Sequence, residues 1–118
     1  MIEVTLIQYL IGKTSAGSNV FAERPNEIPS EYILIDKTGS SVENMIPTST
    51  IAIQSVSDSM QGGSMFDAMS LNDEVKDAME NIIALDDIVS VRLTSDYNYT
   101  DDSTKEYRYQ AVYEITHY

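Results

Sequence analysis

The residues that could carry chemistry in this chain are few, and they lack the partners that catalysis needs. The one histidine of the 118-residue sequence is the penultimate residue, His117, and there is no cysteine. A histidine base in a catalytic triad requires a nucleophile and an orienting carboxylate, and neither this arrangement nor a zinc-ligand spacing surrounds His117. Without cysteine there is no thiol catalysis, disulfide or cysteine-ligated zinc. The sequence therefore gives no positive support for an enzyme, a resident metal or a cofactor.

Acidic residues offer the next candidate, a cation site. Asp86-Asp87 and Asp101-Asp102 are adjacent carboxylates, and oxygen-bearing side chains alternate along residues 96–102. An EF-hand calcium loop needs glycine at its sixth position and glutamate at its twelfth, but counting from Asp96 these positions hold aspartate and tyrosine. Acidic and small polar residues are also typical of turns. We interpret residues 100–104 as a solvated hairpin turn.

The sequence Gly62-Gly63-Ser64 could hold an anion, because it precedes a predicted helix and helix N-termini attract negative charge. However, no P-loop lysine follows, and Asp67 already complements the positive end of the helix dipole. Ser64 is a suitable N-cap. We therefore interpret this stretch as a flexible loop followed by a capped helix.

The C-terminal stretch KEYRYQAVYEITHY (105–118) alternates between two kinds of side chain. In a strand, its odd positions from 107 to 115 share one face, which holds three tyrosines, an alanine and an isoleucine. Stacking platforms for nucleic acid also use strand aromatics, but they lie in positively charged grooves. We therefore predict that the tyrosines pack in the core and that any working face is the polar one. The predicted core tyrosines are Tyr107, Tyr109 and Tyr113, and the polar face presents Arg108, Gln110 and Glu114.

Two helices and several strands must position these side chains. Residues 1–14 show helical spacing, and a long amphipathic helix begins at Ser64. In this N-terminal segment Val4, Ile7, Leu10 and Ile11 follow helical spacing, with Leu6 beside them. Strands are expected over 19–23, 32–37, 50–56, 89–94 and 105–118, with loops over 24–30 and 38–48. This order predicts one α+β domain over 1–118: an antiparallel sheet of about four to five strands, with one long helix packed on one face and a shorter N-terminal helix.

The charge of the chain limits its partners. Seven basic and nineteen acidic residues give the net charge of −12, and the basic residues are scattered singly from Lys13 to Arg108. Domains that bind nucleic acid normally show a basic stripe, so the composition argues against an outer surface that holds DNA or RNA. No run approaches the roughly 20 apolar residues of a membrane span, and the N-terminal residues lack a basic leader. We expect a soluble protein made inside the cell and no membrane partner.

Four stretches together resemble the tail-completion, or tail-terminator, proteins of long-tailed bacteriophages and related prophage neck proteins. They are VFAERPNEIPSEYILIDKTGSS (20–41), STIAIQSVSDSM (49–60), LNDEVKDAMENIIAL (71–85) and YNYTDDSTKEYRYQAVYEITHY (97–118), the last with an Arg-Tyr-Gln core at 108–110. The resemblance covers nearly the whole chain, and each motif is soft by itself. The stretch Gln61-Gly62-Gly63 before the helix departs from the family pattern.

The resemblance implies a virion protein of the tail or neck, made in the cytoplasm of a bacterial host and without catalytic activity. Members of this family commonly form a hexameric ring that caps the tail tube and then meets the head connector. The implied partners are other copies of the chain, the tail-tube protein and the head-connector proteins, with the genomic DNA only as passing cargo. An acidic lumen would repel DNA and keep this path free of sticking.

The residues that make subunit or partner contacts are not visible in the sequence. The loop 38–48 is our leading candidate because it carries two apolar residues, and charged or polar side chains elsewhere are further candidates. The full set is Arg24, Met45, Ile46, Arg108, Gln110 and Glu114. Two other hypotheses stay open: another phage tail protein associated with the tube or tape, and a monomeric acidic domain that binds or regulates a host protein.

Overall fold

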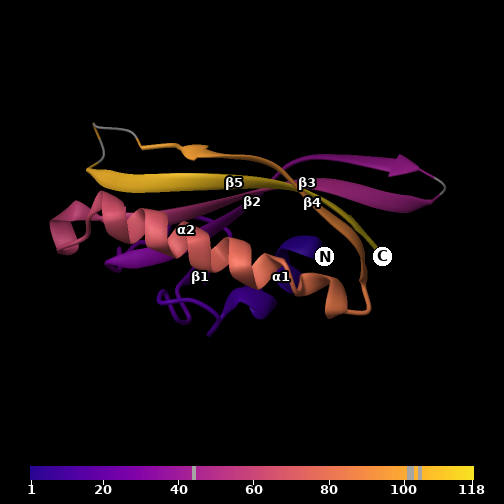
Figure 1. Ribbon diagram of the computed structural model, residues 1–118, viewed down its shortest axis with the longest axis horizontal. Coiled ribbons are helices and arrows are strands. Elements are labelled where there is room, and N and C mark those ends of the chain that lie inside the picture. Colours follow the sequence, from indigo (N-terminus) through magenta and orange to yellow (C-terminus); the bar gives the residue numbers. More distant parts are fainter. Residues whose placement is uncertain (44, 101–102, 104) are drawn as a thin grey trace.

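A computed structural model describes residues 1–43, 45–100, 103 and 105–118. Two helices lie against one face of a five-stranded sheet (Figure 1). The elements in chain order are α1 (Ile2–Leu10), β1 (Val20–Phe21), β2 (Glu31–Glu43), β3 (Ile46–Asp58), the 3-10 turn η1 (Ser59–Gln61), α2 (Met65–Met79), the 3-10 turn η2 (Ile82–Ala84), β4 (Ile88–Asn98) and β5 (Glu106–His117). The predicted α+β class, with a long helix and a shorter N-terminal helix, is confirmed.

The sheet has the strand order β1-β2-β3-β5-β4. Its four long strands are antiparallel, as predicted, and β3 and β5 lie at its centre. The two-residue β1 is parallel to β2, a pairing that the sequence did not indicate. Consequently the outer edge of β2 is covered only near Ile33 and Leu34, and β4 forms the opposite edge of the sheet.

The two helices bury the same side of the sheet. Ser64 caps α2 as predicted, and its hydroxyl accepts a hydrogen bond from the backbone N–H of Asp67. The helix predicted in residues 1–14 is α1, which buries Ile2, Leu6 and Leu10. These residues are spaced by four, so they form one stripe along the helix. Leu10 and its neighbour Leu6 were in the predicted pattern, and Ile7 packs partly buried against the core. Val4 and Ile11 instead lie on the exposed side.

The tyrosines of β5 differ in burial. Tyr113 is buried against the helix layer together with Ala111 and Ile115, as predicted for this face. Tyr107 and Tyr109 are only half-buried, so their assignment to the core was wrong. Their neighbours across the strand pair on β3 are the small Ser57 and Ser55.

The predicted loop over residues 38–48 is mostly strand. β2 continues to Glu43 and β3 begins at Ile46, with Val42 opposite Pro47. The expectation of a loop rested on the glycine and the proline, but Pro47 lies beyond the last β3–β5 pair and needs no partner on that side. A register shift between Lys37 and Gly39 marks a β-bulge where this segment starts.

Candidate interaction surfaces

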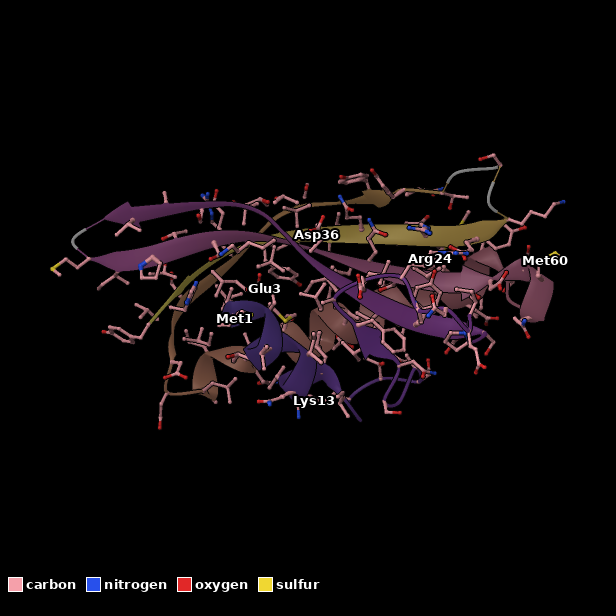
Figure 2. All side chains as sticks on the ribbon, turned by 180° about the vertical axis from the view of Figure 1, so that it is seen from behind. Met1, Glu3, Lys13, Arg24, Asp36 and Met60 are labelled. Atoms are coloured by element: carbon pink, nitrogen blue, oxygen red, sulfur yellow. The ribbon has the colours of Figure 1, made fainter. Side chains whose placement is uncertain are left out.

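A chain of hydrogen-bonded side chains crosses the sheet face that carries no helix. Its centre is Glu106, the first residue of β5, which is 2% exposed. The Glu106 carboxylate accepts hydrogen bonds from Arg24 Nη2 at 2.6 Å, Arg108 Nη2 at 2.5 Å and the Tyr32 hydroxyl at 2.9 Å. Arg24 comes from the segment between β1 and β2, which Figure 2 shows lying over the sheet. One buried carboxylate therefore ties this connecting segment to two strands.

The same chain of side chains continues toward β4. Arg108 Nη1 donates to Gln54 Oε1 at 2.8 Å, and Gln54 Nε2 donates to Gln110 Oε1 at 2.9 Å. Gln110 Nε2 then donates to the Tyr97 hydroxyl at 2.5 Å. Alternation and register explain this line, because Gln54 is paired with Gln110 and Tyr97 with Gln110 across neighbouring strands. We call these seven residues the polar network: Arg24, Tyr32, Gln54, Tyr97, Glu106, Arg108 and Gln110.

The ionisation of the polar network is fixed by its geometry. Burial raises the pKa of the Glu106 carboxyl, but the hydrogen bonds from Arg24, Arg108 and Tyr32 outweigh burial, and the pKa lies below its ordinary value. Burial and the neighbouring Glu106 carboxylate raise the pKa of Tyr32 to about 12. The carboxylate therefore stays charged and the phenol stays neutral near pH 7. An acid–base catalyst needs a pKa near the working pH, so this cluster is suited to holding the fold together.

The distal part of the β2–β3 hairpin forms a second surface. We call residues 38–48 the arm; of these, Asn44 lies outside the described residues. β5 pairs with β3 only as far as Thr48, so the arm extends past the rest of the sheet (Figure 1). Near its tip, Val42 is 70% exposed and Met45 is 93% exposed. The arm therefore presents apolar side chains that the chain itself does not cover.

A groove between α2 and β4 forms a third surface. It has a volume of about 700 Å³ and is lined by five apolar or aromatic side chains and four charged ones, three of them acidic. Ile83 and Leu93 are nearly half exposed there, while Tyr113 forms a buried part of the lining. Lys76, also at the rim, is held by Asp96 at 2.6 Å and Asp73 at 3.3 Å. The groove lining thus mixes apolar side chains with a group of charged ones in which acidic residues are in excess.

Three of the six predicted contact residues, Arg24, Arg108 and Gln110, are brought together in the polar network. Glu114 lies on the same face of β5 but pairs with the exposed Arg92 at 2.7 Å instead. Met45 and Ile46 lie apart from this network, at the tip of the arm. The sequence-based prediction missed Tyr32, Gln54 and Glu106; the alternation of β5 already placed Glu106 beside Arg108, and that was the available signal.

The other candidate chemical residues have structural partners. Ser49 Oγ lies 2.8 Å from His117 Nε2, which fixes the end of β5 to β3. Asp96 accepts hydrogen bonds from Asn72 and Lys76. Within the described ranges, no three acidic or histidine side chains are grouped so that they could hold a metal ion. The predicted turn at 100–104 lies partly outside the described residues, so Asp101-Asp102 cannot be placed.

The glycine-bearing loop before α2 packs against the chain itself. The backbone N–H of Gly63 donates to the Asp58 carbonyl at 2.8 Å, and that of Ser64 donates to Ser57 Oγ at 3.1 Å. The start of α2 is thus held by groups of its own chain, namely the Asp58 backbone carbonyl and the Ser57 and Ser64 hydroxyls. Among the described residues, no helix is long and apolar enough to cross a membrane.

Comparison with known proteins identifies the fold. No protein-family model matches the sequence, and no curated protein matches it. Among solved structures, a chain in the "Virion of native gene transfer agent (GTA) particle" matches with a TM-score of 0.70 and 14% sequence identity. The match covers 98% of this chain and 93% of the other. At this identity the likeness shows a shared fold over the whole domain.

Proposed function

We propose that this chain is a structural protein of a phage-like virion. In our proposal it forms a hexameric ring that ends the tail tube and joins it to the head connector. The observation that carries the proposal is the end-to-end match of the fold to a chain of a gene transfer agent virion. That match agrees in kind with the resemblance to tail-completion proteins in four stretches of the sequence. No catalytic role is part of the proposal.

The shape of the domain supports a role in assembly. It measures 46 × 25 × 24 Å, and the arm lies at one end of the long axis (Figure 1). An elongated unit with a projecting hairpin can reach a neighbour without rearranging its core. If the contacting surfaces differ, such contacts build a ring when the rotation closes.

The charge supports the passage of DNA through the ring. At −12 the chain repels a duplex that carries one negative charge per about 1.7 Å of helix axis. Asp73 and Asp77 of α2 and Glu80, directly after it, are exposed acidic residues. An acidic lumen of this kind would let the genome slide past without binding.

A tail protein associated with the tube or tape is the second candidate function. The observation that favours it is the long outer edge of β4, which lies at the margin of the sheet and has mostly exposed side chains. Edges of this kind can add strands from other chains, and heterologous contacts that do not close build filaments.

The test is deletion of the reading frame from the genome that encodes it, followed by electron microscopy of the particles released. We expect full heads and separate tails with tubes of irregular length, and rescue by the wild-type gene in trans. Joined particles of normal form would refute the proposal. Heads without any tubes would favour the tube-associated alternative. Normal particles with altered host physiology would instead favour a monomeric regulatory domain.

A further inference from the structure

The segment between β1 and β2 lies over the sheet face without helices, and few bonds hold it there. We call its residues 22–29 the lid. Within the described part of the chain, none of these residues makes a backbone–backbone hydrogen bond, and their side-chain hydrogen bonding consists of the bond from Arg24 to Glu106 at 2.6 Å. Pro25 and Pro29 have no N–H to donate. The lid is therefore not part of the hydrogen bonding of the sheet.

Both ends of the lid are fixed to the sheet. Phe21 is paired with Leu34 of β2, and the carbonyl oxygen of Ser30 accepts a hydrogen bond from the backbone N–H of Asp58 at 2.9 Å. Leu34 lies one short stretch of strand beyond Ser30, so roughly 14 Å separate the two ends. The chain from Phe21 to Ser30 can span about 30 Å when extended. The lid thus has enough length to lift while its ends stay in place.

Two large side chains lie buried beneath the lid. Tyr32 and Val56 are each 0% exposed, yet neither belongs to the core cluster under the two helices. They are paired across β2 and β3, and the Tyr32 hydroxyl donates to Glu106 on the face without helices. Figure 2 shows the segment that carries Arg24 lying over this face. The burial of Tyr32 and Val56 is therefore explained by the lid.

Lifting the lid leaves no buried charge without a partner. The Glu106 carboxylate keeps its hydrogen bonds from Arg108 and Tyr32, and Arg24, whose side chain is already 55% exposed, returns to water. An ion pair this exposed stabilises weakly, and the side chains of the lid are exposed or only partly buried. Segments with few buried contacts and few backbone hydrogen bonds are those that open locally in native proteins.

We propose that the lid opens as a unit while the sheet and both helices stay folded, and that the Arg24–Glu106 ion pair is the contact that holds it closed. In the open state the sheet face presents Tyr32 and Val56, which are hidden in the closed state. The fold therefore contains a concealed surface whose exposure is controlled by an ion pair. This device does not depend on the proposed function, since it is built into the single chain.

The absence of native cysteine lets a single introduced thiol report the opening. Val56→Cys places the thiol beneath the lid, and Val75→Cys is the matched control, because Val75 of α2 is also 0% exposed but lies in the core cluster. Each folded protein is labelled with Ellman's reagent. We expect Val56→Cys to react at least ~100-fold faster than Val75→Cys. Its rate should stay nearly constant in low urea, whereas the rate of Val75→Cys should rise steeply. Equal rates with equal urea dependence would refute local opening.

Two arginine variants in the Val56→Cys background test the ion pair. Arg24→Gln removes the pair that opening breaks, so labelling should accelerate about 2–5-fold. Arg92→Gln removes the exposed pair of Arg92 with Glu114, which stays intact when the lid opens, so labelling should not change. Equal acceleration by both variants would show that the thiol reacts only in the globally unfolded chain. No acceleration by Arg24→Gln would show that another contact holds the lid. Either result would overturn the proposal.

Proteolysis of the chain without cysteine gives an independent measurement, which also serves if Val56→Cys does not fold. The protease Glu-C cleaves after glutamate, and Glu23 and Glu27 lie in the lid. Cleavage at these two residues should be faster in Arg24→Gln than in the wild-type protein or in Arg92→Gln. Equal cleavage of the three proteins would contradict the role of the ion pair.

Discussion

Replacing Glu106 by glutamine tests whether the polar network holds the fold together. The substitution keeps the size of the side chain and removes its charge. It leaves Arg108, which is 16% exposed as a side chain, without the carboxylate that lies 2.5 Å away. Arg108 Nε is already buried without a partner among the described residues, and the side chain of Gln54, which Arg108 Nη1 also contacts, carries no charge.

The expected cost follows from the burial of each partner. Arg24 is 55% exposed, and solvent screens its share to less than about 1 kcal/mol. The bonds from the buried Tyr32 and Arg108 are to a charged acceptor and contribute about 1.5–3 kcal/mol each, but glutamine still accepts one of them. Breaking a buried pair from one side costs about 3–5 kcal/mol. We expect a loss of about 3 kcal/mol in the free energy of unfolding, and about 10 °C in melting temperature.

The matched control is Glu114→Gln, the same change on the same face of β5. Its carboxylate pairs with Arg92, and the two side chains are 42% and 70% exposed, so the expected cost is below about 1 kcal/mol. Urea unfolding followed by circular dichroism measures both variants. Equal, small losses would show that the network contributes no more than a surface ion pair and would refute the reasoning.

The stability of the same two variants should also depend differently on pH. Because the folded state lowers the pKa of Glu106, its contribution is present above the ordinary glutamate pKa and is lost as pH falls through the lowered folded value. Wild-type and Glu114→Gln proteins should therefore lose stability on acidification more steeply than Glu106→Gln. Parallel curves for all three proteins would contradict the assigned ionisation.

Three further substitutions test the packing around the helix. Gly63→Ala should destabilise by about 1–3 kcal/mol, because a Cβ there would lie 2.7 Å from the Asp58 carbonyl oxygen and closer still to Ser57 Oγ; an unchanged urea midpoint would show that the loop can shift. Ser64→Ala should cost about 1 kcal/mol through loss of the N-cap, seen as lower stability with an unchanged denaturant slope. Tyr113→Ser should cost about 3–5 kcal/mol, clearly more than Tyr109→Ser, because only Tyr113 is buried; equal losses would contradict the assigned faces.

Local patterns predicted the elements well because each depends on nearby residues. The Ser64 cap and the apolar spacing of α2 identified the long helix, and alternation identified β3, β4 and β5. The arm was mistaken for a loop because glycine and proline are read as breaks. A strand tolerates proline where the edge that carries its nitrogen is unpaired. At Pro47 this depends on where β5 stops pairing with β3, and β5 is distant in the sequence.

The polar network could not be predicted for the same reason. Arg24 and Glu106 are 82 positions apart, and no local pattern places a loop over a particular strand. Alternation did assign Arg108, Gln110 and Glu114 to one face. It did not show that Arg108 and Gln110 belong to the polar network while Glu114 stays near the surface. That difference depends on the segment that carries Arg24, which lies over one part of the sheet.

The polar network and the arm differ in how far their side chains are available for contacts with another molecule. The polar network uses its hydrogen-bonding groups within the chain, so the largely buried Arg108 and Gln110 have little left to offer a partner. The arm differs, because its exposed Val42 and Met45 present apolar side chains. If copies of so acidic a chain assemble as proposed, contacts between surfaces of low charge cost least, because two copies at −12 repel each other.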